Sequence, residues 1–181
     1  MTLVWSGGTR NEHKESVLTG PQFGEIAKQF LKERANIRFQ ASGFSMIPII
    51  RDKDILELAP VEAPSCSCGD IVAFLRPSTR NMVIHRIIGK KGQDYLIKGD
   101  NVPGTDGCFS AEDILGRVTK IVRDGKERSF GLGGEKYLIA FLSRIGILFY
   151  VLRFLTMVKR WFIRLTIPLL CVIIGIKISQ V

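Results

Sequence analysis

Residues 36–130 form a succession of short β-type runs separated by glycine, proline, asparagine and aspartate. Runs of this length, rich in β-branched and aromatic residues and bounded by turn residues, predict strands. No helical pattern intervenes between them, so we expect a mainly β domain with a compact coiled-sheet or barrel-like arrangement. The runs are "NIRFQA", "DILELA", "DIVAFL", "MVIHRII", "DYLIK" and "DILGRVTKIV".

Two segments precede this domain. Residues 1–18 are polar and glycine-rich, which predicts a flexible tail. Residues 19–35 place apolar side chains at helical spacing with charged residues on the other face, which predicts a short amphipathic helix that packs on the β domain. Its apolar positions are Phe23, Ile26, Phe30 and Leu31.

The C-terminal segment, residues 135–181, is apolar and basic and has helical character. The chain carries a formal net charge of +9, and from Tyr137 onward it contains lysine and arginine but no aspartate or glutamate. The longest run without a charge, Leu165 to Ile176, is shorter than the ~20 apolar residues that cross a bilayer. Arg153, Arg160 and Arg164 are spaced to share one helical face.

This pattern predicts a membrane-associated tail, in which residues 137–177 contact an anionic membrane as in-plane helices or as a short insertion. The alternative is a soluble helical hairpin that is buried on a partner or on the protein itself. The apolar residues around the charges suit a lipid surface better than base reading, so we expect no nucleic-acid partner.

The four cysteines do not form a pattern that predicts chemistry. Cys66 and Cys68 form C-x-C, which is neither a C-x-x-C redox motif nor half of a common zinc site. We therefore expect no metal and no cofactor.

Two short stretches hold the candidate reactive residues. "ASGFSMIPII" places Ser45 between a glycine turn and a Met-x-Pro, and "MVIHRIIG" contains His85. A serine hydroxyl needs an adjacent base to become a nucleophile, and an isolated serine in a turn is more often structural. His85 lies in a β-type run, where strict alternation places it on the same face as Val83 and Ile87.

A third stretch, "YLIKGDNVPGTDG", supplies candidate carboxylates. Asp100 and Asp106 lie in this turn-rich segment one hairpin after His85. Either carboxylate could fix the tautomer of the imidazole and stabilise the imidazolium, which is the orienting role in a Ser-His-Asp triad. Spacing along the chain does not choose between them, because triads are defined by geometry.

Taken together, these stretches resemble the ordered sequence boxes of the type I signal peptidase superfamily. "SGFSMIPII" resembles the nucleophile box, "CGDIVAF" the strand that follows it, "VIHRIIG" the general-base box and "IKGDNVPGTD" the terminal box. The boxes appear in family order over residues 36–122. His85 stands where most bacterial members have lysine, which resembles the endoplasmic-reticulum and archaeal branch that uses serine, histidine and aspartate.

The resemblance implies a serine endopeptidase that removes a leader or signal segment from a precursor at a membrane. It implies Ser45 as nucleophile, His85 as general base and Asp106 as the partner of His85, with Asp100 structural or supporting. Backbone N–H groups near Ser45 would bind the oxyanion, while Met46 and Pro48 would hold the turn and line the edge of the cleft. The precursor polypeptide would bind as an extended strand.

One departure and two alternatives accompany this resemblance. A polar tail and an amphipathic helix stand where relatives have a membrane anchor before the serine. We therefore expect the C-terminal tail to associate the protein with a membrane, and we expect this to be the plasma membrane. A LexA-type self-cleaving regulator would need an N-terminal DNA-binding domain and a lysine base, which residues 1–35 and His85 do not match. A catalytically silent, membrane-tethered β module that serves for binding is the third reading.

Overall fold

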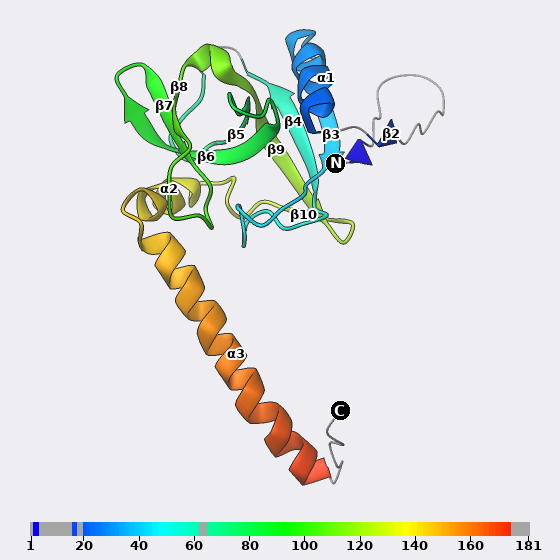
Figure 1. Cartoon of the computed structure of the whole chain (residues 1–181), viewed down its shortest axis with the longest axis vertical. Helices are drawn as coiled ribbons and strands as arrows, with labels where there is room; N and C mark the ends of the chain where they lie inside the picture. The colour runs from blue at the N-terminus through cyan, green and yellow to red at the C-terminus, as the bar shows by residue number, and fades with distance from the viewer. Residues whose placement is uncertain (1, 4–15, 18–19, 62–64, 175–181) are drawn as a thin grey trace.

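The computed structural model describes residues 2–3, 16–17, 20–61 and 65–174 (Figure 1). The predicted flexible tail, residues 1–18, lies outside the described residues except for two short strands that pair with each other, β1 (Thr2–Leu3) and β2 (Ser16–Val17). Residues 175–181 of the predicted C-terminal segment also lie outside them.

The predicted β runs form one antiparallel sheet. The strands are β3 (Ile37–Gln40), β4 (Ile55–Pro60), β5 (Ile71–Leu75), β6 (Met82–Lys91), β7 (Asp94–Lys98), β8 (Gly107–Phe109), β9 (Ile114–Arg123) and β10 (Lys126–Arg128). The strand order is β2-β1-β3-β4-β9-β5-β6-β7-β8, and β10 pairs with β9. The path begins at β2 and ends at β8 without closing, so the prediction of a mainly β fold is confirmed as a strand-rich, open antiparallel sheet rather than a closed barrel.

The strands bury side chains on both faces of the curled sheet. Successive residues of β6 alternate between two apolar clusters, because neighbouring side chains of a strand point to opposite faces. Met82 and Ile84 join the larger cluster with Phe39 and Leu56, whereas Val83 and Ile87 join the smaller one with Phe74. The two faces of β6 are therefore both packed, and this strand positions side chains precisely on either side.

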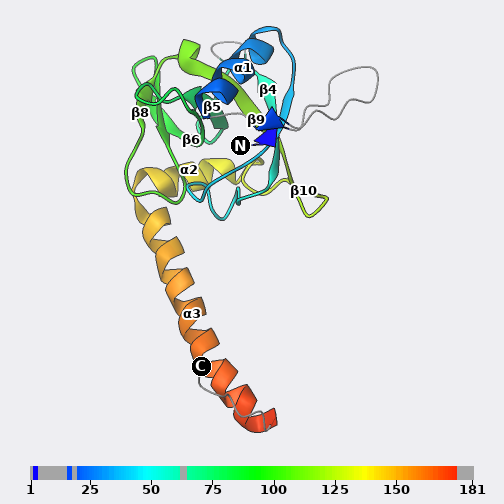
Figure 2. The same cartoon turned by 45° about the vertical axis from the view of Figure 1, so that its right-hand side comes forward.

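The amphipathic helix predicted at residues 19–35 is confirmed as α1 (Gly20–Lys32). The helix lies over the sheet (Figure 2). Its buried side chains Phe23, Ala27 and Leu31 cover the larger cluster. The ring of Phe23 packs edge-on against that of Phe39, with the ring centroids 5.3 Å apart. Burial of apolar side chains of this size stabilises the fold by about 1.5–3 kcal/mol each relative to exposure.

The C-terminal segment forms two helices, α2 (Lys136–Arg144) and α3 (Ile147–Ile174). Gly146, with a φ of 78°, ends the first and turns the chain. α2 packs on the sheet through Ile139 and Ala140, and the buried ammonium of Lys98 donates a hydrogen bond to the Ser143 carbonyl at 2.8 Å. α3 leads away from the rest of the protein (Figures 1 and 2).

In the described part of the chain, no single helix is long and apolar enough to cross a membrane. The helix Lys136–Arg144 and the segment Ile147–Lys159 meet the requirement only as a pair, and they are bent by 96° relative to each other.

Candidate active site

The turn that carries Ser45 lies between β3 and β4 and is held from several sides. Gly43 adopts a φ of 110°, a conformation that favours glycine, and its N–H donates to the Asp52 carboxylate at 3.0 Å. Asn101 donates its backbone N–H to the Ser45 carbonyl at 2.7 Å and its side-chain amide to the Phe44 carbonyl at 3.0 Å. The backbone on both sides of the Ser45 hydroxyl is therefore fixed by the segment after β7.

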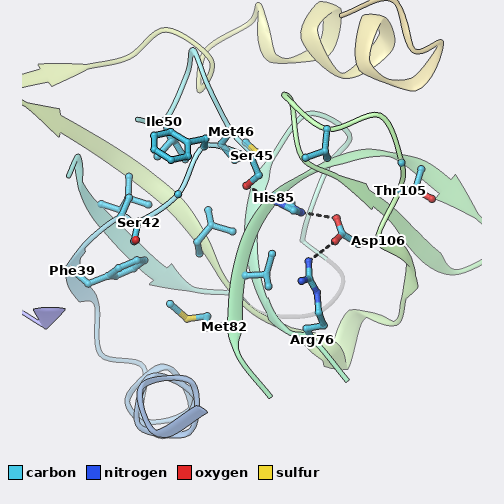
Figure 3. A pocket seen from close by; sticks show the side chains of 18 residues that line it. Phe39, Ser42, Ser45, Met46, Ile50, Arg76, Met82, His85, Thr105 and Asp106 are labelled. Atoms are coloured by element: carbon cyan, nitrogen blue, oxygen red, sulfur yellow. Dashed lines mark hydrogen bonds and ion pairs between the residues drawn. The ribbon is translucent and has the colours of Figure 1, made fainter. Parts of the chain in front are cut away.

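Ser45, His85 and Asp106 form a hydrogen-bonded chain (Figure 3). The Ser45 Oγ lies 2.8 Å from His85 Nε2, and His85 Nδ1 lies 2.5 Å from Asp106 Oδ2. With the proton on Nδ1, the imidazole donates to the carboxylate and leaves Nε2 free to accept from the serine hydroxyl. The fold thus brings together three residues that are 40 and 21 positions apart in the chain.

The imidazole of His85 is held tightly by its surroundings. Its side chain is only 5% exposed, and the Phe74 ring lies beside it with the ring centroids 6.3 Å apart. A Cβ on Gly99 would lie 2.9 Å from both His85 Nε2 and the Ser45 carbonyl oxygen. Glycine at position 99 is therefore what allows the β7 end to approach the Ser45–His85 pair this closely.

Asp106 has a different partner on each carboxylate oxygen. Oδ2 contacts His85, and Oδ1 accepts a hydrogen bond from the Arg76 guanidinium at 3.1 Å. Burial alone would raise the pKa of this carboxyl, but the hydrogen bonds and charges of His85 and Arg76 outweigh it and hold the pKa below its usual value. Asp106 is therefore ionised at neutral pH and can stabilise a protonated imidazole.

Asp100 lies on the other side of β6 and contacts Arg86 instead of His85. The Arg86 guanidinium donates to both Asp100 carboxylate oxygens at 2.8–3.2 Å, and both side chains are completely buried. The same guanidinium also donates to the carbonyls of Gly69 and Gly131. Spacing along the chain left both carboxylates open and the resemblance favoured Asp106; in the structure Asp106 contacts His85, whereas Asp100 belongs to a buried ion pair.

A cleft of about 550 Å³ opens beside these residues (Figure 3). Ser45, His85, Arg76 and Asp106 form its polar end. Met46 lines the cleft as expected, but Pro48, which follows a cis peptide bond, is not among the lining residues that the structure describes. The apolar wall consists of Phe39, Ala41, Ile50, Leu56, Met82 and Ile84.

Three residues of the site were not singled out from the sequence. Gly99 and Asn101 lie in the quoted "KGDN" stretch, so their position beside Asp100 was a usable signal. Arg76 follows β5 in a hairpin loop, and nothing local to that loop predicts its contact with Asp106, which lies 30 residues further along the chain.

The cysteines and carboxylates do not assemble into a metal site in the described residues. The Cys66 thiol is buried, which raises its pKa to about 11, so it stays protonated and unreactive at neutral pH.

Comparisons of the chain with protein-family models, with curated proteins and with solved structures found no match.

Proposed function

We propose that the protein is a serine endopeptidase of the signal-peptidase type, with Ser45 as nucleophile, His85 as general base and Asp106 as the group that orients His85. The observation that carries the proposal is the continuous hydrogen-bonded chain from Ser45 Oγ through the imidazole to Asp106. Nucleophile, base and orienting carboxylate within hydrogen-bond reach are the geometric signature of this chemistry. The position of the chain at one end of an open cleft gives a substrate access to the hydroxyl.

The proposed reaction has two stages. Ser45 Oγ attacks a peptide carbonyl carbon while His85 Nε2 takes the hydroxyl proton, and an ester bond replaces the broken C–N bond as His85 passes that proton to the leaving amine. Water then attacks the ester with His85 again acting as base, which releases the acyl product and restores the Ser45 hydroxyl.

Backbone N–H groups of the nucleophile turn are proposed to bind the oxyanion. In the described part of the chain, the N–H groups of Ser45 and Met46 donate to no acceptor. Each donor aimed at a developing oxyanion contributes about 3 kcal/mol in serine proteases. The fixed Ser45 and Phe44 carbonyls keep this turn in one conformation, which preorganises these donors.

The substrate is proposed to bind as an extended strand along β6. This strand pairs with β5 over residues 82–86 but with β7 only from Arg86 onward, so residues 82–84 have one edge without a strand partner in the described structure. A polypeptide added to that edge would run beside the apolar wall of the cleft toward Ser45. We therefore propose an apolar leader or signal segment of a precursor as the substrate class.

Covalent labelling of Ser45 tests the proposal directly. The full-length protein is incubated with a fluorophosphonate probe, and the modified peptide is identified by mass spectrometry. We expect labelling at Ser45 that is lost in Ser45→Ala and reduced at least ~10³-fold in rate in His85→Ala, because the hydroxyl then lacks its base. Ser67→Ala, which removes an exposed serine outside the cleft, should label at the wild-type rate.

Cleavage of a co-expressed precursor with an apolar leader completes the test. Loss of cleavage in Ser45→Ala, with unchanged thermal unfolding, supports the peptidase. Equal labelling of wild type and His85→Ala would contradict the catalytic role and favour a binding module. Conversion of the purified protein into two fragments of its own chain would favour the self-cleaving class.

A further inference from the structure

The first half of α3 exposes a continuous apolar side and, outside it, basic residues. Large apolar side chains recur at helical spacing along one side, and all of them are more than a third exposed. Arg153, Thr156 and Lys159 lie outside this side and are also exposed, and Arg153 lies over the ring of Phe149, which is also outside it. We call the apolar side the α3 stripe; it consists of Ile147, Tyr150, Val151, Phe154, Leu155 and Val158.

Exposed apolar surface of this kind is unusual for a protein without a partner, and it continues onto α2. Tyr137, Leu138 and Phe141 are each more than half exposed, whereas the other side of α2 is buried on the sheet. Contiguous apolar patches larger than a few hundred Å² mark interaction sites. The charges identify the partner, because from Tyr137 onward every charged side chain is basic.

We infer that the α3 stripe docks on an anionic lipid bilayer, with α3 lying in the interfacial region. An amphipathic helix with aromatic and aliphatic residues on one side and lysine or arginine on the other binds in this way. Its apolar side enters the boundary between headgroups and acyl chains, while Arg153 and Lys159 reach anionic headgroups along their flexible stems. This inference does not depend on the peptidase activity.

Because α2 is attached to the sheet, docking of α3 on the bilayer would also set the orientation of the cleft relative to the bilayer. The Lys98 ammonium holds the Ser143 carbonyl near the end of α2, and the Arg144 guanidinium packs against Gly89 of β6. At the start of α2, Lys136 pairs with the buried Asp70 at 2.7 Å. β6 also carries His85, so the docked helix and the candidate active site are linked through one rigid strand.

Vesicle co-sedimentation tests the docking surface in the full-length protein. Vesicles of phosphatidylglycerol and phosphatidylcholine are compared with vesicles of phosphatidylcholine alone. We expect binding at least ~10-fold stronger to the anionic vesicles and a further fall in strong salt. Phe154→Gln combined with Leu155→Gln should weaken binding roughly tenfold or more, because two apolar side chains leave the acyl boundary. Thr156→Gln outside the stripe should change binding less than about twofold.

The outcomes separate the possible occupants of the surface. Equal binding to both kinds of vesicle, or equal loss in Thr156→Gln and the double variant, would overturn the inference. A concentration-dependent dimer in lipid-free sedimentation velocity that the double variant abolishes would assign the stripe to a second copy and also overturn it. Ser45 labelling in the same preparations reports the peptidase separately, and an unchanged far-UV spectrum shows that the variant is folded.

A different observation concerns Arg76, and the inference from it rests on the proposed peptidase activity. Its guanidinium is 46% exposed in the cleft and contacts the Asp106 oxygen that His85 does not use. The titratable groups that face Asp106 are His85 from β6 and Arg76 from the loop after β5. We propose that Arg76 is a positioning residue that fixes the rotation of the Asp106 carboxylate toward His85.

Rates measured across pH test this role. Arg76→Gln is expected to lower kcat and the Ser45 labelling rate about tenfold, to leave KM nearly unchanged, and to move the acid-side loss of activity to higher pH, because Asp106 loses a cation that favours its ionised form. Arg76→Lys should restore most of the rate. Arg80→Gln, which breaks the exposed Arg80–Glu25 pair in the same loop, is the matched control.

An increase in KM with unchanged kcat and an unmoved pH profile in Arg76→Gln would overturn the positioning role and make Arg76 a substrate contact. A wild-type protein whose Ser45 does not label would instead contradict the peptidase proposal, so the two failures are distinguishable.

Discussion

Arg86 and Asp100 form a fully buried ion pair, and Arg86 directly follows His85, which contacts Ser45. His85 and Arg86 are neighbours in β6, so their side chains point to opposite faces of the strand. Asp100 adds a backbone N–H contact to the Met46 sulfur at 3.4 Å, and its neighbour Asn101 holds the Ser45 carbonyl. The ion pair thus fixes the segment after β7 against β6, and this segment in turn fixes the nucleophile turn.

Breaking this ion pair should destabilise the fold. Arg86→Ala leaves the Asp100 carboxylate and the Gly69 and Gly131 carbonyls buried without a partner, and we expect the free energy of unfolding to fall by about 3–5 kcal/mol. Arg86→Lys should recover little of this, because an ammonium cannot reproduce the bidentate contact. Urea unfolding followed by circular dichroism measures both, and a loss as small as that of Arg80→Ala would contradict the anchoring role.

Gly99→Ala should damage the site more than the fold. The added Cβ would lie 2.9 Å from both His85 Nε2 and the Ser45 carbonyl oxygen, so one of these groups must move. A displacement of this kind at the reacting groups costs about 10²-fold in rate. The Ser45 labelling rate measures the effect. Gly134→Ala, where a Cβ meets no neighbouring atom, is the control, and an unchanged rate in Gly99→Ala would contradict the observed close approach.

Asp106→Asn should separate catalysis from stability. The amide keeps the shape of the side chain but favours the wrong imidazole tautomer and cannot stabilise the imidazolium, so we expect the labelling rate to fall roughly 10³–10⁴-fold. The midpoint of thermal unfolding should change little. Asp100→Asn should show the reverse pattern, a marked loss of stability from the uncompensated Arg86 charge. If Asp100→Asn lost activity at full stability, the assignment of the two carboxylates would be exchanged.

The carboxyl of Asp54 makes stability depend on pH. Burial would raise its pKa, but hydrogen bonds from Arg123 and the Arg51 backbone, with the Arg123 charge, lower it below the ordinary value. A carboxyl with a depressed pKa in the folded state stabilises the protein above its unfolded pKa of about 3.9, and this contribution disappears as the pH falls through the folded value.

We therefore expect the free energy of unfolding to drop as the pH falls below the unfolded pKa of about 3.9, and Asp54→Asn to make this dependence shallower. Urea unfolding at several pH values measures it. Asp94→Asn, at the exposed start of β7, serves as control; an equally steep acid loss in Asp54→Asn would contradict the role of the Asp54–Arg123 pair.

The elements of the fold could largely be predicted from local pattern. Each of the six β runs is a strand and residues 19–35 contain a helix, because apolar alternation and turn residues act within a few positions of the chain. β8 and β10 were not predicted, since their three residues are too short to show alternation. The bend between α2 and α3 was not predicted; it coincides with Gly146, whose φ of 78° favours glycine.

The sequence by itself determined the strands, the amphipathic helix and the identities of the candidate reactive residues Ser45, His85, Asp100 and Asp106. Chain spacing left the partner of the imidazole open and the resemblance favoured Asp106; the tertiary structure brings Asp106 to it, because that depends on the side of β6 to which each carboxylate is brought by the segment after β7. The tertiary structure also decided that Arg76 completes the site, and that the apolar side chains of α3 remain exposed. These facts depend on contacts between segments that are distant in the chain. Local preferences do not determine such contacts, which form only when the strands pair.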